Sequence, residues 1–246
     1  MIRVLIWNEF YHEQFQRTVK QVYPEGIHRA LADFLGAEED ITVRTATLYD
    51  ENCGITKEIL EETDVLLWWG HAKHGEVPDE IAELVRDAVL DGMGAIFLHS
   101  AHHSKPFRLL MGTPCHLTWR ESADREVLWV IDPAHPITRD VDRYFVLPAE
   151  ETYGEPFVVP NPDKVLLIGN YSGGEVFRSA CLYERGNGKI LYFQPGHETF
   201  PTYKDPNVQS VIRNAVRFLT PTYRVRPTCP HVRKITDDEP YVILKK

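Results

Sequence analysis

Residues 65–71 read Val65-Leu66-Leu67-Trp68-Trp69-Gly70-His71, an apolar run that ends in a histidine. Two further apolar runs behave in the same way, because residues 95–98 lead into His99 and residues 190–193 are soon followed by His197. Runs that are apolar at every position are typical of parallel strands buried on both faces. The carboxyl ends of such strands meet at one edge of a sheet, where open α/β folds bind ligands. We therefore expect the three histidines to lie around one pocket.

Helical patterns separate these runs along the chain. The clearest helix starts at Pro78, carries an apolar stripe and stops at Gly92. We expect strands at 3–7, 41–48, 65–70, 93–98 and 188–193, and helices at 26–36, 56–62, 78–92 and 205–219. This alternation predicts an α/β fold with a doubly wound, mostly parallel sheet and helices on both faces.

The segment at 113–179 has a different character, since β-branched and aromatic stretches are broken there by prolines. We interpret it as a mixed β segment inserted near the edge of the sheet. Residues 1–220 are expected to form a single domain. Residues 221–246 contain four prolines and are expected to form a C-terminal extension that is compatible with contacts in a homo-oligomer.

Composition narrows the classes of function. The chain has 246 residues and a formal net charge of −9, which argues against nucleic acid as a partner. No apolar stretch approaches the roughly 20 residues that a membrane helix needs, and the chain enters a strand directly after Met1. We therefore expect a cytoplasmic protein without a membrane partner. The four cysteines are scattered, which gives no support for a zinc knuckle or a redox pair.

The histidines are candidates for a metal site. His71 and His74 have the i, i+3 spacing of a ligand pair on one helical turn. Together with His99, His103 and His197, they could supply the three protein ligands of an open catalytic zinc site. A cluster of neutral, hydrogen-bonded histidines without a metal fits the same sequence. Both alternatives stay open at this point.

Ser100 and the Gly196-His197-Glu198 motif are candidates for catalysis. Ser100 follows a strand, as does the nucleophile of an elbow, but the elbow glycines are missing, which favours a role as a helix N-cap. Side chains of consecutive residues point to opposite sides of an extended backbone. Only a turn at Gly196 would therefore bring both His197 and Glu198 to the pocket, and a histidine that caps loop carbonyls is the alternative.

Other candidates are aromatic or charged. Residues 150–155 read Glu-Glu-Thr-Tyr-Gly-Glu, and this short loop would supply acid, base and hydroxyl-binding groups unless it is a solvated turn. Trp69, Trp119 and Tyr153 offer flat faces that could stack on sugar rings, although aromatic residues at strand ends are more often part of a core. Arg178 is either a buried ion-pair partner or an anchor for a ligand oxygen.

These motifs together resemble those of the ThuA-like, or trehalose-utilisation, family, within the class I glutamine amidotransferase-like fold group. The resemblance covers roughly residues 3–219. It rests on Trp68-Trp69-Gly70-His71, on Phe97-Leu98-His99-Ser100, on the acidic segment at 150–156, and on Gly188-Lys189 leading to Gly196-His197-Glu198.

The resemblance implies a flavodoxin-like sheet, a role in the catabolism of a disaccharide or an oxidised sugar derivative, and a ligand site at the strand ends. It does not imply amidotransferase chemistry, because the wider group has a cysteine at the elbow and a His and Glu two residues apart. Here Ser100 or its neighbour stands at the elbow, and His197 and Glu198 are adjacent.

Our hypothesis from the sequence is an enzyme that acts on a small-molecule sugar. Protons would be handled by His99, Glu151, His197 and Glu198, and substrate would be bound by Trp69, Ser100, Tyr153 and Arg178. A divalent metal such as zinc would be held by His71, His99 or His103, and His197, and no nucleotide cofactor is expected. The alternatives are a serine hydrolase that uses Ser100 and a non-catalytic protein that binds sugar or serves as an accessory chain.

Overall fold

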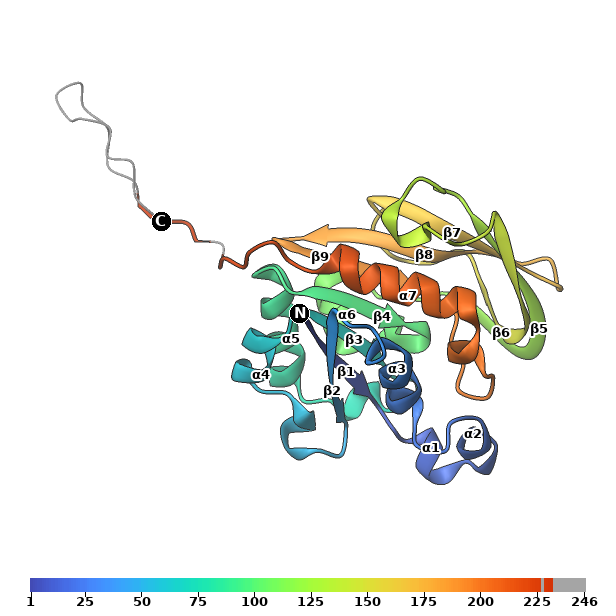
Figure 1. Cartoon of the computed structure of the whole chain (residues 1–246), viewed down its shortest axis with the longest axis horizontal. Helices are drawn as coiled ribbons and strands as arrows, with labels where there is room; N and C mark the ends of the chain where they lie inside the picture. Colours follow the sequence, from blue (N-terminus) through green and yellow to red (C-terminus); the bar gives the residue numbers. More distant parts are fainter. Residues whose placement is uncertain (227, 232–246) are drawn as a thin grey trace, which may run out of the picture.

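The strands form one mixed sheet in the computed structural model, which describes residues 1–226 and 228–231 (Figure 1). Across the described part of the chain, the strand order is β2-β1-β3-β4-β9-β8-β7-β5-β6. The bounds are β1 Ile2–Asn8, β2 Ile41–Thr47, β3 Val65–Trp69, β4 Gly94–Leu98, β5 Thr118–Val130, β6 Tyr144–Gly154, β7 Lys164–Tyr171, β8 Val176–Arg185 and β9 Gly188–Phe193.

The sheet has a parallel half and an antiparallel half. Strands β2, β1, β3, β4 and β9 pair in parallel, in the order that is typical of flavodoxin-like sheets. Strands β8, β7, β5 and β6 continue the same sheet in antiparallel fashion, and Figure 1 shows them gathered at one end of the molecule. The α/β fold is confirmed. The expectation of a mostly parallel sheet is wrong, because the mixed β segment extends the sheet with antiparallel pairs.

Helices cover both faces of the parallel half. On one face, α3 (Ile27–Leu35) and α7 (Pro206–Leu219) share a core with Leu67 of β3. On the other face, α4 (Lys57–Glu62), α5 (Asp79–Leu90) and α6 (Lys105–Met111) share a core with Leu66 and Trp68 of the same strand. Successive residues of β3 therefore enter opposite cores, which is why its sequence is apolar throughout.

Several short elements lie outside the expected pattern. The polar stretch after β1 forms α1 (His12–Phe15) and α2 (Arg17–Val22), and residues 99–103 form a 3₁₀ helix, η3. The cap of α6 is Ser104, whose hydroxyl accepts from the backbone N–H of Phe107. The expectation that Ser100 caps this helix is wrong, because η3 separates Ser100 from its start. The other 3₁₀ helices are η1 Glu51–Gly54, η2 His74–Glu76, η4 Pro136–Thr138 and η5 Thr202–Lys204.

The parallel strands end together at one edge. In the register of the sheet, Asn8 of β1 lies opposite Trp69 of β3, Trp69 lies opposite Leu98 of β4, and Leu98 lies opposite Phe193 of β9. The residues that follow these four ends are therefore neighbours in space. This row positions the candidate site.

The segment after α7 returns to the opposite edge of the sheet. There the backbone N–H of Val225 donates to the carbonyl of Asp91, and the Asn187 side chain donates to the carbonyl of Val225. Most of the expected C-terminal extension, residue 227 and residues 232–246, lies outside the described residues. Within the described part of the chain, no helix has both the length and the apolar character needed to cross a membrane.

Candidate metal centre

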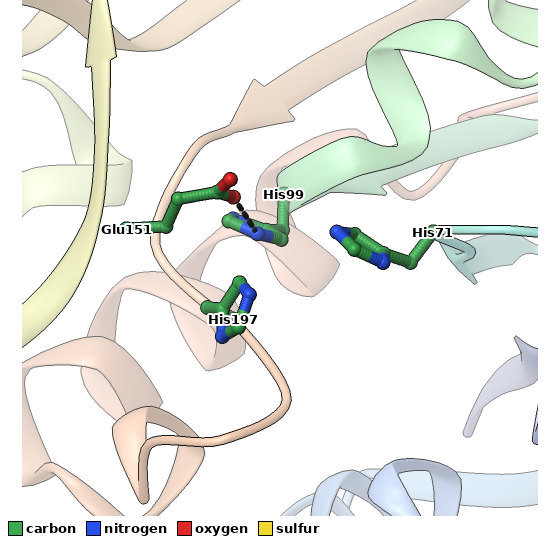
Figure 2. Close-up of side chains that lie close together, drawn as sticks. All are labelled: His71, His99, Glu151 and His197. Carbon is green, nitrogen blue, oxygen red and sulfur yellow. Dashed lines mark ion pairs between the residues drawn. The ribbon is translucent and has the colours of Figure 1, made fainter. Parts of the chain in front are cut away.

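Four side chains from distant parts of the chain meet at the carboxyl edge of the sheet (Figure 2). They are His71 after β3, His99 after β4, Glu151 on β6 and His197 after β9, and one ligand atom of each lies within 4.8 Å of the others. The ring centroids of the three histidines are 5.4 to 6.1 Å apart. Residues separated by more than a hundred positions thus form one cluster, which we call the His3Glu cluster.

His99 occupies the elbow position of the fold. Its backbone is left-handed, with φ of 52°, and its carbonyl accepts from the Tyr192 hydroxyl at 3.1 Å. Its Nδ1 lies 2.9 Å from the carbonyl of Gln194, which can only accept, so this nitrogen carries a proton. The other ring nitrogen, Nε2, is thereby directed to Glu151 at 2.9 Å.

His99 and Glu151 shift each other's protonation. Burial opposes the charged form of His99, but the hydrogen bond and charge of Glu151 prevail and raise the pKa of His99 to about 9. Burial likewise opposes ionisation of Glu151, and the hydrogen bond and charge of His99 outweigh it and lower the pKa of Glu151 to about 2. Without another cation, the two groups form a buried ion pair.

The other two histidines of the cluster are neutral near pH 7. Burial, reinforced by the charges of His99 and His12, lowers the pKa of His71 to about 3. Burial also lowers the pKa of His197 to about 4, although Glu198 opposes the shift. Neutral imidazoles are the form that binds metal ions.

The donor set fits a divalent transition metal. Three imidazoles and one carboxylate match the ligands that zinc and similar ions take. His197 Nε2 is buried and has no hydrogen-bond partner, while its Nδ1 lies 2.8 Å from the Thr199 hydroxyl. The backbone N–H of Thr199 also donates to this Nδ1 at 3.3 Å, so the proton of the neutral, metal-free ring lies on Nε2. Nε2 can bind a metal when the proton moves to Nδ1, where the Thr199 hydroxyl can accept it.

Two buried glutamates hold the loops that carry the histidines. Glu9, directly after β1, accepts the backbone N–H groups of His71, Ala72 and Lys73 at 2.8 to 2.9 Å. Burial raises the pKa of Glu9 although these three bonds oppose the shift. Sequence reasoning missed Glu9. The one signal in the sequence is its position directly after the predicted strand at 3–7, whereas its place beside His71 follows from the pairing of β1 with β3.

Glu150 plays the same part for the His197 loop. Its carboxylate accepts the N–H groups of Gly196 and His197 at 3.0 Å and the Thr202 hydroxyl at 2.8 Å. Burial raises the pKa of Glu150, and the charge of His99 opposes that shift. Segment 150–155 is therefore neither a loop nor a solvated turn. It lies at the end of β6, and its residues 150–154 are buried.

The turn at Gly196 decides how His197 and Glu198 point. Gly196 has φ of 137°, and a Cβ there would clash with the Tyr203 hydroxyl oxygen. Both following side chains are buried, with His197 Nε2 3.7 Å from Glu198 Oε2. Glu198 Oε1 also lies 3.6 Å from His12, which the sequence analysis did not single out.

A cavity of about 350 Å³ opens beside the cluster. Its lining is aromatic, hydroxylic and histidine-rich: His71, His74, Ser100, His102, His103, His116, Leu117, Trp119, Glu121, Glu151 and Tyr153. A larger cavity, of about 520 Å³, lies along α5 and α6. We assign the ligand site to the smaller cavity because it contains residues of the His3Glu cluster.

Tyr153 and Ser100 lie together in this cavity. Their hydroxyl oxygens are 2.8 Å apart, and the Tyr153 ring stacks on His99 with centroids 5.0 Å apart. Burial raises the pKa of Tyr153 well above its ordinary value, so the phenol stays protonated. The two expected hydroxyl-bearing residues are thus placed where a ligand would lie.

Other expected site residues lie elsewhere. Trp69 is fully buried and donates from Nε1 to the carbonyl of Gly196 at 3.0 Å, so it offers no face to a sugar. Arg178 forms an ion pair with Glu155 at 2.7 Å and also donates to the carbonyl of Phe157, away from the cavity lining. Of its two expected roles, the ion-pair role fits this placement.

His74 and His103 lie outside the His3Glu cluster. Neither belongs to a group of donors that could share an ion among the described residues. His74 begins the 3₁₀ helix η2 and does not share a helical turn with His71, so the i, i+3 pairing is wrong. His103 is half buried at the cavity wall beside His102 and His116.

The α/β fold of this chain is shared with several solved structures. Solved structures of the same fold include a putative ThuA-like protein from Bacteroides uniformis, with TM-score 0.65, 16% identity, and coverage of 89% of this chain and 91% of that one. A cytoplasmic protein from Salmonella typhimurium has TM-score 0.59 and 13% identity, over 90% of this chain and 100% of that one. A putative GMP synthase protein from Thermoplasma acidophilum has TM-score 0.52 and 11% identity, over 89% and 94%.

The chain belongs to the ThuA family, which is described as trehalose utilisation and matches residues 3–219. The resemblance drawn from the sequence is thereby confirmed. A comparison with curated proteins finds no match.

Proposed function

We propose that this protein is an enzyme that acts on a neutral carbohydrate, or on an oxidised derivative of one, with a divalent cation held by the His3Glu cluster. The observation that carries the proposal is the convergence of His71, His99, Glu151 and His197 beside a cavity of ligand size. A bound cation would polarise a substrate oxygen or lower the pKa of a bound water.

The chain's own residues supply the remaining chemistry. Tyr153 keeps its proton and faces the cavity with Ser100, so the two hydroxyls can orient a substrate oxygen and donate to it. Trp119 is 65% exposed and lines the cavity, where its ring can stack on a sugar. Glu9 and Glu150 fix the loops and so preorganise the cluster.

Apart from the proposed cation, the side chains that line the cavity offer little positive charge, which supports an uncharged substrate. Its lining has two carboxylates, Glu121 and Glu151, and no lysine or arginine among the described residues. Burial lowers the pKa of His74 and His102 to about 3, so these walls carry no positive charge at pH 7. A phosphorylated sugar would find no cationic partner among the side chains of this lining.

Amidotransferase and serine-hydrolase chemistry have less support. The residue in the elbow conformation is His99, where amidotransferases of this fold group place a cysteine. Ser100 bonds to Tyr153, and no hydrogen bond joins it to His197 within the part of the chain that is described. We therefore propose that glutamine hydrolysis is absent.

The relatives support the biological setting of the proposal. The description of the family as trehalose utilisation supports a role in carbohydrate catabolism. The Salmonella structure is described as a cytoplasmic protein, which supports a cytoplasmic location for this chain as well.

The test is turnover of neutral disaccharides, trehalose among them, and of their keto derivatives, with the 6-phosphates as comparison. Metal-stripped protein and protein reloaded with Zn²⁺ or Mn²⁺ are assayed in parallel. We expect turnover of a neutral substrate only after reloading, and His197→Ala to reduce it at least about tenfold while the protein stays folded. His231→Ala is the matched control, since His231 is exposed and lies outside the cavity lining.

Two results would contradict the proposal. Full activity of His197→Ala would show that the His3Glu cluster takes no part in the reaction. Saturable sugar binding without product, in metal-loaded protein, would favour the non-catalytic sugar-binding protein instead.

A further inference from the structure

A second group of donors lies beside the His3Glu cluster. It consists of His12 at the start of α1, His71 after β3 and Glu198 after β9, and one donor atom of each lies within 4.8 Å of the other two. We infer that this group binds a second divalent cation next to the first. The inference rests on the proposed function, because it adds an ion to the same centre.

A hydrogen bond accounts for only one of the three contacts within this group. His12 Nε2 lies 3.1 Å from His71 Nδ1, and Glu198 Oε1 lies 3.6 Å from His12 Nδ1 and 3.8 Å from His71 Nδ1. The last two distances exceed the reach of a good hydrogen bond, about 3.2 Å. Two donors that are each about 2.1 Å from one cation lie about 3.0 Å apart at a right angle and about 4.2 Å apart when opposite. The distances from His71 Nδ1 to His12 Nε2 and to Glu198 Oε1 fall within this range.

The Glu198 carboxylate connects the two groups of donors. Its Oε1 faces His12 and His71, while its Oε2 lies 3.7 Å from Nε2 of His197. Glu198 Oε2 and His197 Nε2 are both buried, and neither atom has a hydrogen-bond partner. An unpaired buried carboxylate oxygen is destabilising unless a cation or a proton satisfies it. A carboxylate with one oxygen directed to each group is arranged as a bridge between two ions.

The side chains at this edge can be divided between two ions. If His71 gives Nδ1 to the second ion, the first ion keeps His99, Glu151 and His197, and Glu198 Oε2 can complete its set. The other nitrogen of His12, Nδ1, lies 2.7 Å from the side-chain amide of Gln16. The Gln16 atom at this distance is the amide nitrogen, which donates to Nδ1. A cation at Nε2 therefore requires that the Gln16 amide turn, so that its oxygen accepts from Nδ1 and Nε2 is left free.

Two adjacent cations narrow the class of substrate. A pair of ions can hold two neighbouring oxygens of one ligand, as two-metal enzymes do. In a carbohydrate this chemistry corresponds to a vicinal diol or to a hydroxyl beside a carbonyl. The substrate class of this site is therefore a neutral sugar that presents such a pair of oxygens to the cavity.

The experiment measures Mn²⁺ bound to the full-length, metal-stripped protein by mass spectrometry, and records the electron paramagnetic resonance spectrum of the loaded sample. We expect two ions per chain and a spectrum of two spin-coupled ions. His12→Gln should bind one ion and give the six-line spectrum of isolated Mn²⁺. Glu198→Gln should lose the spin coupling, because it removes the bridge.

Controls separate this inference from the proposed function. His103→Gln changes a histidine of the cavity wall outside both groups and should still bind two ions. One ion in the native protein, unaffected by His12→Gln, would overturn the second site and leave the first intact. Two ions without spin coupling would also overturn it, and no bound ion at all would overturn both. The spectrum of the native protein needs no variant, so a misfolded substitution cannot obscure the result.

Discussion

At the scale of single residues, the site depends on backbone conformations that side chains enforce. His99 adopts φ of 52°, which is uncommon for a residue with a Cβ and costs on the order of 1 kcal/mol or more. The bonds from Tyr192 to its carbonyl and from its Nδ1 to Gln194 hold it there. The consequence of that strained conformation is the direction of Nε2, which faces Glu151 and not the core.

Gly196 is the second residue of this kind, and we predict that Gly196→Ala destabilises the protein by about 2 to 4 kcal/mol. Both the positive φ and the close approach of the Tyr203 hydroxyl exclude a methyl group. Urea unfolding followed by tryptophan fluorescence measures the change.

The control for Gly196→Ala is Gly75→Ala, where a Cβ would meet nothing within 4 Å. We expect that variant to change stability by less than about 0.5 kcal/mol. Tyr203→Phe should recover part of the loss in the double variant, since it removes the clashing oxygen. Equal stabilities of Gly196→Ala and Gly75→Ala would refute the packing argument.

Glu150 allows a prediction about loop positioning. Glu150→Gln keeps the shape but weakens the bonds to the N–H groups of Gly196 and His197, so we expect about tenfold weaker binding of Zn²⁺. Competition with a chromogenic chelator measures the affinity. Glu58→Gln, at a fully exposed site on α4, should leave it unchanged. Equal affinities in the two variants would exclude a positioning role for Glu150.

At the scale of elements, the sequence predicts the parallel half of the sheet well. The runs at 65–70, 93–98 and 188–193 are apolar throughout, and Pro78 and Gly92 delimit α5. The end of strand β6 is not predictable in this way, because a pair of glutamates such as Glu150 and Glu151 predicts an exposed segment unless their binding partners are known. Their burial depends on pairing with groups far along the chain, such as the N–H of His197.

An ion pair at the start of the parallel strands, between Asp64 and Arg3, predicts that stability depends on pH. Asp64, before β3, accepts from the backbone and the guanidinium of Arg3 on β1 at 2.8 to 3.1 Å. Burial opposes the shift, but these bonds and charges prevail and lower the pKa of Asp64 below its ordinary value. The pair therefore stabilises the fold above the ordinary pKa, and this stability is lost as the pH falls through the lowered pKa.

We expect Asp64→Asn to lose about 1 kcal/mol at neutral pH, a modest value because Arg3 is half exposed. The difference from the native protein should shrink as the pH is lowered below about 4. Unfolding curves at several pH values test this expectation. Asp33→Asn, on the exposed face of α3, should show little difference at any pH. If the stability lost in Asp64→Asn were the same at every pH, the contribution of Asp64 would not be ionic.

At the scale of the whole molecule, distant segments meet at both edges of the sheet. The carboxyl edge gathers the donors of the candidate metal centre, and the opposite edge receives residues 224–226. Sequence periodicity cannot predict such meetings, because it reports only the face of each element. His12 and Glu9 show this limit: their place beside His71 follows from the pairing of β1 with β3.

The contact of the C-terminal segment gives a prediction at this scale. The Arg224 guanidinium donates to the carbonyls of Leu60, Glu61 and Thr63 at the end of α4. Arg224→Ala should therefore lower the free energy of unfolding by about 1 to 2 kcal/mol. Arg226→Ala is the control, because that side chain is largely exposed and its pair with Asp91 is long, at 3.3 Å. Equal effects of the two substitutions would contradict the assignment.

The proposed metal centre requires that donors of the His3Glu cluster hold a divalent cation at the cavity. Diffraction from crystals of zinc-loaded protein, recorded on both sides of the zinc absorption edge, tests this requirement most directly. We predict an anomalous peak within about 2.3 Å of donor atoms of the His3Glu cluster. An empty cluster in fully zinc-saturated crystals, or zinc bound only elsewhere on the chain, would contradict it.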